Sequence, residues 1–476
     1  MRDSLTITRR KLLSGMSVLA GSSLIIPGAY ASDTSTESDE ETESESPRRW
    51  CIKNATVLTM EPGQAPLTKA DVWVVDGRIE AVGESLDTGD SEMIDGEGCI
   101  VMPGMVDTHN HMWQTQMRGM FGQREGSLFF PVTKELGEHF RPGDTWIGEY
   151  LAAMENVNAG VTTSNDFFDN NRGPEHSQAA LEALAASPLR ARLLFGNESK
   201  TTDGQIDLER LTELHENWER YAERGRLSLG LAWRLPENLD NQDAMAMKRR
   251  EFDTAREMNL PIAVHVSGEN HHGMFQTLID GDFLIPELQV VHATDAREEH
   301  MDALNEAGAS LALTPITEHR VAYGLTRLSH FERVERQGLG IDGNALAGSG
   351  DMFEIMKHAA LTEIAASEDE TSVDCERLVA LATRLGAESI GMGDEIGTLT
   401  PGKQADLIMI DTKRINLGML PTEPYAFTVF AATPADVSLV AVGGRIAKRG
   451  GKLLDMDEEQ IASRIDASLS HLRDNL

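Results

Sequence analysis

Residues 101–112 read VMPGMVDTHNHM, an apolar run that is interrupted by Asp107 and by the pair His109 and His111. In a β-strand, side chains two residues apart point to the same side. Two imidazoles with this spacing can therefore hold one metal ion at the end of a strand. Taken alone, such a pair more often belongs to a polar loop, so the interpretation depends on residues further along the chain.

Beyond this stretch, apolar runs typical of buried strands alternate with amphipathic segments typical of helices. One helix is predicted over residues 144–160, with Asp144 placed to cap its start and Gly160 to end it. Eight strands alternating with helices predict an α/β fold, a TIM-like (β/α)8 barrel with catalytic groups at the carboxyl ends of its strands. After a first strand that ends at Val106, the strands are predicted at residues 163–166, 193–197, 229–233, 262–266, 290–292, 311–314 and 340–342.

Strand and turn patterns flank this region on both sides. They cover residues 51–60, 70–82 and 99–101 before it and residues 396–411 and 437–447 after it, with Asp76-Gly77 as a hairpin turn. Each set is too small to be stable alone, so we expect both ends of the chain to build one composite β-sandwich. The predicted domains are the N-terminal half of the β-sandwich (50–100), the (β/α)8 barrel (101–395), the C-terminal half of the β-sandwich (396–455) and a C-terminal helix (456–476).

The N-terminus has the pattern of an export signal. Residues 8–13 read TRRKLL, which resembles the twin-arginine signal, and the apolar run 12–26 precedes an AxA-type cleavage site at residues 29–31. The rival interpretation is a transmembrane anchor, for which the run is short. We therefore expect residues 1–31 to be a cleaved signal peptide and 32–49 an acidic disordered linker. The mature chain is expected in the periplasm or outside the cell, without a stable membrane anchor.

Composition excludes several classes of protein. The 476-residue chain has a formal charge of -34 and a pI near 4.7, which argues against nucleic acid and anionic membranes as partners. Cys51, Cys99 and Cys375 form no CxxC pair. A cysteine-rich zinc site, a disulfide framework and the deaminases that hold zinc with cysteine are therefore excluded. We expect a small-molecule substrate and a homo-oligomer.

Five polar side chains lie at predicted strand ends. His109 and His111 close the first strand, His265 lies in the fifth, His292 in the sixth, and Asp342 ends the eighth. Each follows an apolar run, where an unpaired buried polar group would be costly. Because imidazole and carboxylate suit a borderline divalent ion, their gathering at one end of the barrel indicates a metal site.

With these residues in view, the chain resembles the amidohydrolase superfamily, in the branch of cytosine deaminases, triazine hydrolases and S-adenosylhomocysteine deaminases. The resemblance runs from about residue 52 to residue 447. PGMVDTHNH resembles the first-strand motif and NAGVTTSNDF the second; VVHATDAREEHMDALNEAGASLALTP resembles the sixth and seventh, and IDGNALAGSGDMFEIM the eighth. It implies that one divalent ion, zinc before iron, is held by His109, His111, His265 and Asp342.

The resemblance also implies hydrolysis of a carbon–nitrogen bond, other than a peptide bond, in a small planar or cyclic nitrogenous compound. Asp342 would then act as the base and His292 would stabilise the developing oxygen charge. The fourth strand, LSLGLAWR, contains no lysine that could bridge a second ion. Two alternatives remain open: hydrolytic displacement of another leaving group, as in a chlorohydrolase, and a metal-binding barrel without turnover.

One position departs from the deaminase pattern. Deaminases have a glutamate three residues after the fifth-strand histidine, where this chain has Gly268. Glu269 and Glu318 are the candidates to replace that acid, and each is equally well explained as a solvated loop carboxylate.

The residues after the histidine pair are expected to form the wall of the substrate pocket. Trp113, Gln114 and Arg118 are the candidates for substrate binding, together with His292. Phe129 could stack on a planar substrate, although aromatic residues in such loops equally often serve packing.

Overall fold

The computed structural model describes residues 49–197, 204–267, 271–414, 417, 422–454 and 456–475. The predicted signal peptide, nearly all of the predicted linker, and Gly268 and Glu269 lie outside these residues. Among the described helices, none combines the length and the apolar character needed to cross a bilayer.

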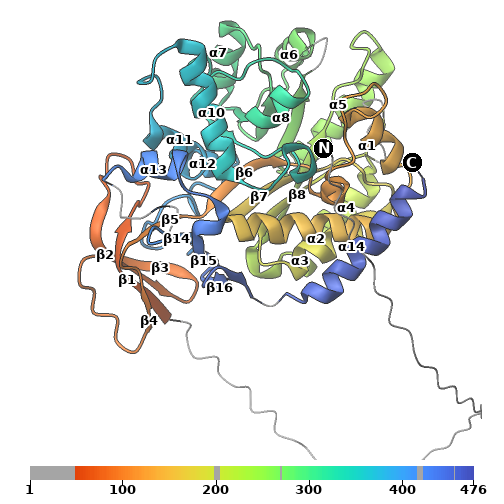
Figure 1. Cartoon of the computed structure of the whole chain (residues 1–476). Helices are drawn as coiled ribbons and strands as arrows, with labels where there is room; N and C mark the ends of the chain where they lie inside the picture. Colours follow the sequence, from red (N-terminus) through yellow and green to blue (C-terminus); the bar gives the residue numbers. More distant parts are fainter. Residues whose placement is uncertain are drawn as a thin grey trace, which may run out of the picture. The chain divides into compact units, whose positions relative to one another are not determined.

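Eight parallel strands form a barrel in the order in which they occur along the chain (Figure 1). Nearly every residue of these strands is buried, because helices cover the outside and side chains fill the inside. The (β/α)8 prediction is therefore confirmed. The strands are β6 (Met105–Asn110), β7 (Val161–Phe168), β8 (Arg190–Phe195), β9 (Leu227–Trp233), β10 (Ile262–Val266), β11 (Leu288–His292), β12 (Ser310–Leu313) and β13 (Gln337–Leu339).

The barrel closes between its first and last strands. The N–H of Asp342 donates to the carbonyl oxygen of His109 (2.8 Å), and the N–H of Ile341 donates to Oδ1 of Asp107 (2.9 Å). The eighth strand was expected at residues 340–342, but β13 ends at Leu339. Asp342 has a left-handed backbone (φ 59°). The turn after β13, rather than the strand itself, therefore brings Asp342 beside His109.

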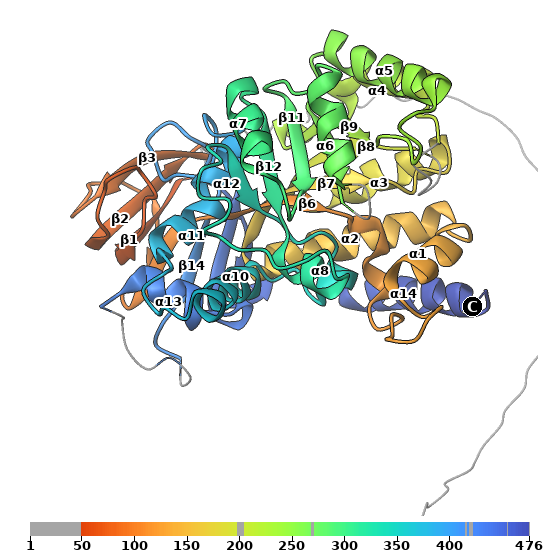
Figure 2. The same ribbon diagram turned by 90° about the horizontal axis from the view of Figure 1, so that it is seen from above.

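Helices surround the strands (Figure 2). The long helix α2 (Pro142–Ala159) starts two residues earlier than expected, with Arg141 at its N-cap. Asp144 is the third helical residue and accepts the Arg141 backbone N–H (2.9 Å), so it does not occupy the cap itself. Gly160 ends the helix with φ 98°, as predicted. The other barrel helices are α1 (Phe129–Gly137), α3 (Pro174–Ala186), α4 (Leu208–Glu216), α5 (Gln242–Glu257), α6 (His271–Asp280), α7 (Glu298–Ala307), α8 (Pro315–Arg320), α9 (Asn344–Ala347), α10 (Met352–Ser367), α11 (Cys375–Leu381) and α12 (Arg384–Ser389).

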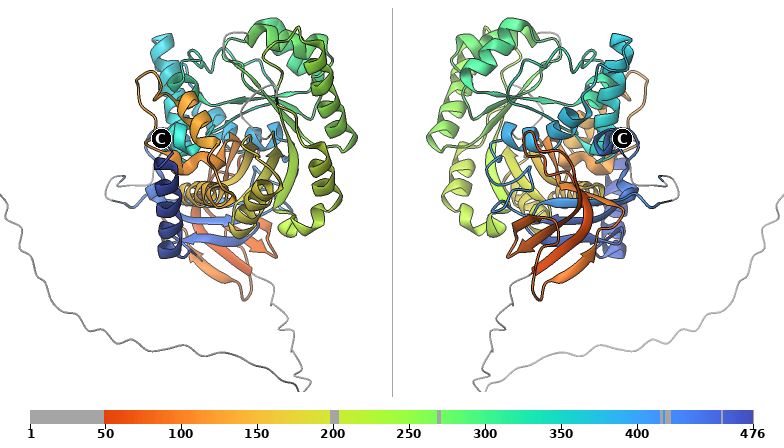
Figure 3. Two further views of the ribbon diagram at one scale, coloured as in Figure 1. Left: turned by 90° about the vertical axis from the view of Figure 1, so that its right-hand side faces the viewer. Right: turned by 90° about the vertical axis from the view of Figure 1, so that its left-hand side faces the viewer.

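Strands from both ends of the chain form one mixed sheet beside the barrel. Figure 3 shows the orange N-terminal strands against the blue C-terminal ones, and the register joins Cys99 of β5 to Asp411 of β14. The composite module is thereby confirmed, although its C-terminal half is regular only from Leu407 onward. Its strands are β1 (Arg49–Val57), β2 (Leu67–Val75), β3 (Arg78–Gly83), β4 (Glu92–Asp95), β5 (Cys99–Pro103), β14 (Leu407–Asp411), β15 (Val437–Val442), β16 (Arg445–Arg449) and β17 (Lys452–Leu453).

The predicted hairpin turn connects β2 to β3. Asp76 and Gly77 both have left-handed backbones, with φ of 48° and 85°. This conformation matches the twist of two antiparallel strands. A Cβ atom at position 77 would lie 2.7 Å from the carbonyl oxygen of Gly443, so only glycine fits there.

Two buried cations tie the sheet to the barrel. Arg190 of β8 donates from Nε and Nη2 to Asp406 (3.0 and 3.1 Å), just before β14. Lys448 of β16 donates to the carbonyl oxygen of Asn158 (2.5 Å), at the end of α2. The helix α13 (Pro424–Phe430) packs on α10 and α11, and the last helix α14 (Glu458–Arg473) packs on α2.

Candidate metal centre and its cavity

Three imidazoles and one carboxylate converge at the carboxyl ends of the barrel strands. Nε2 of His265, on β10, lies 3.1 Å from Nε2 of His109, on β6. It also lies 3.3 Å from Nε2 of His111, directly after β6. Oδ1 of Asp342 lies 3.1 Å from Nε2 of His109 and 3.3 Å from Nε2 of His111. The structure thus brings together the four predicted ligands.

The separations of these four side chains suit one ion. Their ligand atoms all lie within 4.8 Å of one another. Where two imidazole nitrogens face each other, only one of them can donate a proton to the other. The three converging rings are therefore not all satisfied by hydrogen bonds to one another. Ligand atoms about 2.0–2.2 Å from a tetrahedral zinc ion are separated by about 3.4 Å, close to the distances found here. The donor set therefore fits a single zinc-like divalent ion.

The protein environment sets the protonation of these ligands. Burial lowers the pKa of His109 to about 4 and holds the pKa of His265 well below its usual value. Burial also disfavours charge on His111, but Asp169 and Asp342 raise the pKa of that ring to about 9. Burial opposes ionisation of Asp342, yet the surrounding imidazoles hold its pKa well below the usual range. Binding of an ion requires neutral rings and an ionised carboxylate, so it displaces a proton from His111.

His292 lies beside the four ligands. Its Nε2 is 3.9 Å from Oδ2 of Asp342, and its Nδ1 is 3.2 Å from Oε1 of Glu318. Glu318 is fully buried and also accepts the N–H of Thr314 (2.9 Å) and the hydroxyl of Thr326. His292 has a left-handed backbone (φ 71°), a conformation that is costly for this residue type and that is often found at functional sites.

Asp169, after β7, supports the metal centre from behind. Its Oδ1 lies 3.1 Å from Nδ1 of His111 and accepts the indole N–H of Trp113 (2.8 Å). Its Oδ2 accepts from Nη2 of Arg234 (2.7 Å). A carboxylate on the second nitrogen of a metal-binding histidine fixes the orientation of the ring.

A cavity of about 170 Å³ is lined by three of the four predicted ligands: His111, His265 and Asp342. Aromatic rings form one side of it: Phe129 packs edge-to-face on Phe130, with centroids 5.1 Å apart, and Phe130 lies 6.3 Å from Tyr323. Burial raises the pKa of Tyr323, so its hydroxyl stays protonated at neutral pH. The described lining consists of His111, Phe129, Phe130, Lys134, Asp169, Arg234, His265, Ser267, His292, Val321, Tyr323, Asp342 and Leu346.

The structure corrects several expectations about this wall. Trp113 and Gln114 are fully buried, because the 3-10 helix η1 (Met112–Met117) turns them beneath the strand ends. Arg118 does not line the cavity; its Nη2 lies 2.5 Å from Oε2 of Glu155. Glu318 supports His292 from behind and does not line the cavity. The other candidate acid, Glu269, lies outside the described residues.

Four ionisable residues of the lining were missed by the sequence analysis: Asp169, Arg234, Tyr323 and Lys134. Arg234 follows β9 directly and Asp169 follows β7 directly, so both stand at the end of a strand. The rule that identified His292 therefore applies to them as well. Tyr323 and Lys134 lie beyond the strand ends, on the turn after α8 and on α1, where strand patterns give no signal.

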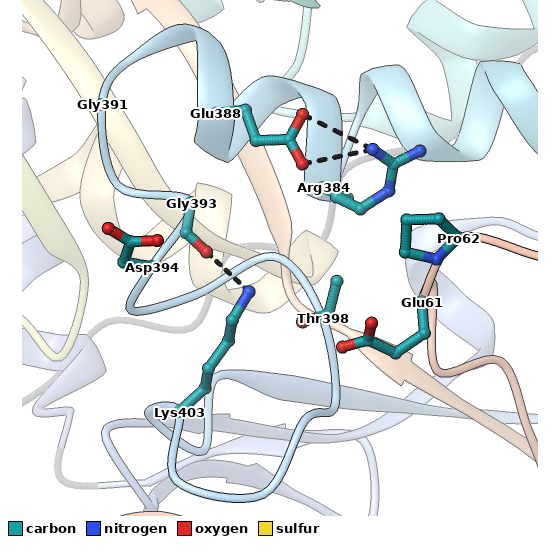
Figure 4. Close-up of a pocket in the computed structure, with 9 residues that line it drawn as sticks. All are labelled: Glu61, Pro62, Arg384, Glu388, Gly391, Gly393, Asp394, Thr398 and Lys403. Atoms are coloured by element: carbon teal, nitrogen blue, oxygen red, sulfur yellow. Dashed lines mark hydrogen bonds and ion pairs between the residues drawn. The ribbon is translucent and has the colours of Figure 1, made fainter.

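A larger hollow lies beside α12 (Figure 4), and none of the predicted ligands lines it. Its cations are already engaged. Arg384 pairs with Glu388 (3.1 Å), and Lys403 donates to the carbonyl oxygen of Gly393 (2.5 Å). In TIM barrels the chemistry takes place at the carboxyl ends of the strands, so the smaller cavity is the functional one.

Comparison with known proteins agrees with this geometry. Residues 100–447, well over half of the chain, match the model of the Amidohydrolase family. The chain is a member of this family. As an amidohydrolase it is a metal-dependent hydrolase that acts on carbon–nitrogen bonds, other than peptide bonds, of small nitrogenous compounds.

Relatives of this amidohydrolase include deaminases. It is 27% identical over 444 residues to a 5'-deoxyadenosine deaminase of Methanosarcina mazei, covering 88% of this chain and 98% of that protein. It is 28% identical over 442 residues to a 5-methylthioadenosine/S-adenosylhomocysteine deaminase of Syntrophobacter fumaroxidans, covering 87% and 96%.

Solved structures share the fold. An adenosine deaminase of Xanthomonas campestris with bound zinc superimposes with a TM-score of 0.77 at 21% identity, covering 89% of this chain and 98% of that one. An atrazine chlorohydrolase of Arthrobacter aurescens complexed with zinc gives a TM-score of 0.76 at 20% identity, covering 88% and 100%.

Proposed function

We propose that this amidohydrolase is an aminohydrolase or amidase that releases ammonia or an amine from a small planar or cyclic nitrogenous compound. One divalent ion, which we propose to be zinc, would be held by His109, His111, His265 and Asp342. The observation that supports this most directly is the convergence of three Nε2 atoms and one carboxylate oxygen, with neighbouring atoms 3.1–3.3 Å apart, at the cavity. When bound there, the ion supplies positive charge that lowers the pKa of water toward neutrality.

Asp342 is placed to move the proton of the attacking water. Its Oδ1 faces the ligand histidines, while Oδ2 lies on the side of His292, 3.9 Å from Nε2. Oδ2 can therefore accept a proton and pass it to the leaving nitrogen. A low pKa keeps this carboxylate ionised at neutral pH.

His292 and Tyr323 are two polar groups of the cavity wall that can contact the substrate. Glu318 and Thr314 engage Nδ1 of His292, which directs Nε2 toward the cavity. Nε2 can then hydrogen-bond the substrate atom that gains charge as water attacks. The protonated hydroxyl of Tyr323 can donate to a ring nitrogen of the substrate.

A second candidate function is hydrolytic displacement of another leaving group, such as chloride. Within the described portion of the cavity wall, the only carboxylates are Asp169 and Asp342, and both are engaged by neighbouring side chains. A ring amine needs a proton donor for the ring nitrogen, whereas a better leaving group depends less on that proton. Glu269, outside the described residues, is the alternative donor that we retain from the sequence.

The test is an assay of the zinc-loaded protein with 5'-deoxyadenosine, 5-methylthioadenosine, S-adenosylhomocysteine and atrazine. Ammonia and chloride are measured separately. We expect ammonia release from at least one nucleoside, and loss of at least about a thousandfold in kcat for Asp342→Asn. Asp144→Asn, which removes the charge of another buried carboxylate that does not line the cavity, serves as the control and should retain activity.

Each outcome of this assay is decisive. Chloride release without ammonia release favours the second candidate. A protein that binds one equivalent of zinc but hydrolyses none of the compounds contradicts the aminohydrolase proposal and favours a metal-binding barrel.

We also propose that the enzyme works outside the cytoplasm, as a homo-oligomer. Support for export comes from Arg9-Arg10 in residues 8–13 and from the AxA-type site at residues 29–31. Replacing both arginines by lysine should retain the protein in the cytoplasm, and size-exclusion chromatography with light scattering measures the oligomeric state.

A further inference from the structure

We infer that the substrate carries an anionic group, and that Arg234 and Lys134 receive it. This inference rests on the proposed function, because it concerns the same cavity and adds the charge of the molecule that enters. It is carried by three observations: the charges of the cavity wall, the way in which Arg234 is held, and the lack of a described partner for Lys134.

The described cavity wall has spare positive charge and no spare negative charge. Apart from histidines, its ionisable groups are Asp169, Asp342, Lys134, Arg234 and Tyr323. Asp342 belongs to the metal centre, and Asp169 is engaged by three side chains. Among its described residues, the wall therefore offers no free carboxylate to a cationic substrate, whereas both cations retain N–H donors without a described partner.

Arg234 is held with its guanidinium at the cavity. Nη2 donates to Asp169 (2.7 Å), and the guanidinium carbon lies 5.1 Å from the centroid of the Phe167 ring. The same ring packs against His265, with centroids 4.4 Å apart. Arg234 is thus one side chain away from the metal centre, with 18% of its side chain exposed.

This fixation leaves further donors of Arg234 available. Asp169 takes Nη2, and a guanidinium carries five N–H donors in one plane. A planar fork held in advance loses little entropy when a carboxylate or similar anion binds to it. The outer edge of the guanidinium is therefore suited to receive an anionic group.

Lys134 provides the second positive charge. It is exposed on α1, lines the same cavity, and forms no hydrogen bond or ion pair with any described residue. The whole chain has 77 acidic and only 43 basic side chains. In so acidic a protein, a lysine at the cavity without a described acidic partner favours a negatively charged ligand over a positive one.

A purely structural role is the rival explanation for Arg234. Its ion pair with Asp169 holds the carboxylate that orients His111, and this role alone would account for the arginine. It does not account for Lys134, which supports no described side chain. An experiment that includes both residues therefore separates substrate recognition from support of the metal centre.

The experiment is isothermal titration calorimetry of the zinc-loaded protein with two aromatic probes. Benzenesulfonate carries a negative charge on a group that binds metals weakly, and methyl phenyl sulfone is a neutral molecule of similar shape. We expect the wild type to bind benzenesulfonate at least about tenfold more tightly than the sulfone, as charge-assisted hydrogen bonds would produce.

The variants assign this preference to the two residues. Lys134→Met and Arg234→Gln should each weaken benzenesulfonate binding at least about tenfold. Binding of the sulfone should change less than about twofold. Lys357→Met, which removes an exposed lysine on α10 outside the cavity, is the matched control and should bind both probes like the wild type. Zinc content is measured for every variant, and Lys134→Met decides the matter if Arg234→Gln loses the ion.

Two results overturn the inference: equal affinity of the wild type for the two probes, and benzenesulfonate binding that neither Lys134→Met nor Arg234→Gln weakens. Because the readout is binding, it does not depend on turnover. A protein that prefers benzenesulfonate but releases no ammonia from any compound contradicts the proposed function and leaves this inference standing.

Discussion

Oε1 of Glu318 lies 3.2 Å from Nδ1 of His292, and both side chains are buried. The other oxygen of Glu318 accepts the hydroxyl of Thr326, so the carboxylate faces away from the cavity. Glu318 therefore affects the reaction only through His292. It fixes the ring so that Nε2 points toward Asp342 and the substrate.

The first prediction concerns this pair. Glu318→Gln keeps the size of the side chain but removes its charge, which weakens the hold on Nδ1 of His292. We expect kcat to fall about tenfold or more while KM changes little, since an interaction of His292 with the transition state is impaired. Steady-state kinetics of the zinc-loaded variant measure the effect.

A matched control tests whether the loss is specific. Glu363, on α10, is also a buried glutamate and is paired with Arg327 (2.9 Å). Glu363→Gln should leave kcat within about twofold. Equal losses in the two variants would mean that general destabilisation, rather than the orientation of His292, explains the result.

The second prediction concerns Asp169 and metal affinity. Asp169→Asn removes the charge beside Nδ1 of His111, 3.1 Å away. Replacing such an outer carboxylate typically weakens metal binding about 10–100-fold. Competition with a fluorescent zinc chelator measures the dissociation constant. Asp144→Asn is the control, and an unchanged affinity in Asp169→Asn would show that this contact does not support the ion.

The third prediction concerns removal of the metal. Dialysis against a chelator should abolish turnover, and zinc should restore it if the assignment of the ion is correct. Because an ion bound only by the folded state stabilises that state, zinc at a hundred times its Kd adds about 2.7 kcal/mol to the free energy of unfolding. Differential scanning calorimetry with and without zinc measures this effect. Restoration by ferrous iron alone would reassign the metal.

Sequence patterns could predict the convergence of the candidate metal ligands because strand ends in a barrel share one location. His109, His111, His265, His292 and Asp342 all lie where that rule puts them. The expected position of Asp342 at the strand ends holds although β13 ends earlier than predicted. The left-handed turn at Asp342 and its hydrogen bond to His109 return the carboxylate to the strand ends.

The cavity wall was much less predictable. Proximity in sequence placed Trp113 and Gln114 there, but the 3-10 helix that contains them turns both side chains inward. Lys134 and Tyr323 enter the wall from segments outside the strands. The directions of such segments depend on long-range packing, which alternation of apolar and polar residues does not encode.

The fourth prediction concerns the joint between sheet and barrel. Arg190 and Asp406 form a bidentate ion pair, and their side chains are 6% and 2% exposed. Removing one partner leaves the other charge buried and unpaired, so Asp406→Asn should lower the free energy of unfolding by about 3–5 kcal/mol. Urea unfolding measures the change. Glu213→Gln, which breaks an exposed pair with Arg210, should cost less than about 1 kcal/mol.

The last prediction concerns Glu149, which is fully buried on α2 and has no hydrogen-bond donor among the described residues. Burial raises the pKa of Glu149 well above its usual value, and nearby Asp166 raises it further. Between the unfolded and the folded pKa, the folded state binds more protons than the unfolded state. The contribution of Glu149 to the free energy of unfolding therefore falls as the pH rises above about 5, by up to about 1.4 kcal/mol per pH unit. Glu149→Gln cannot ionise, so its stability relative to the wild type should increase between pH 5 and pH 8.

Urea unfolding at both pH values measures the difference, with the exposed Glu209→Gln as a control that should show no such trend. Parallel pH dependences of wild type and Glu149→Gln would mean that Glu149 is ionised in the folded protein.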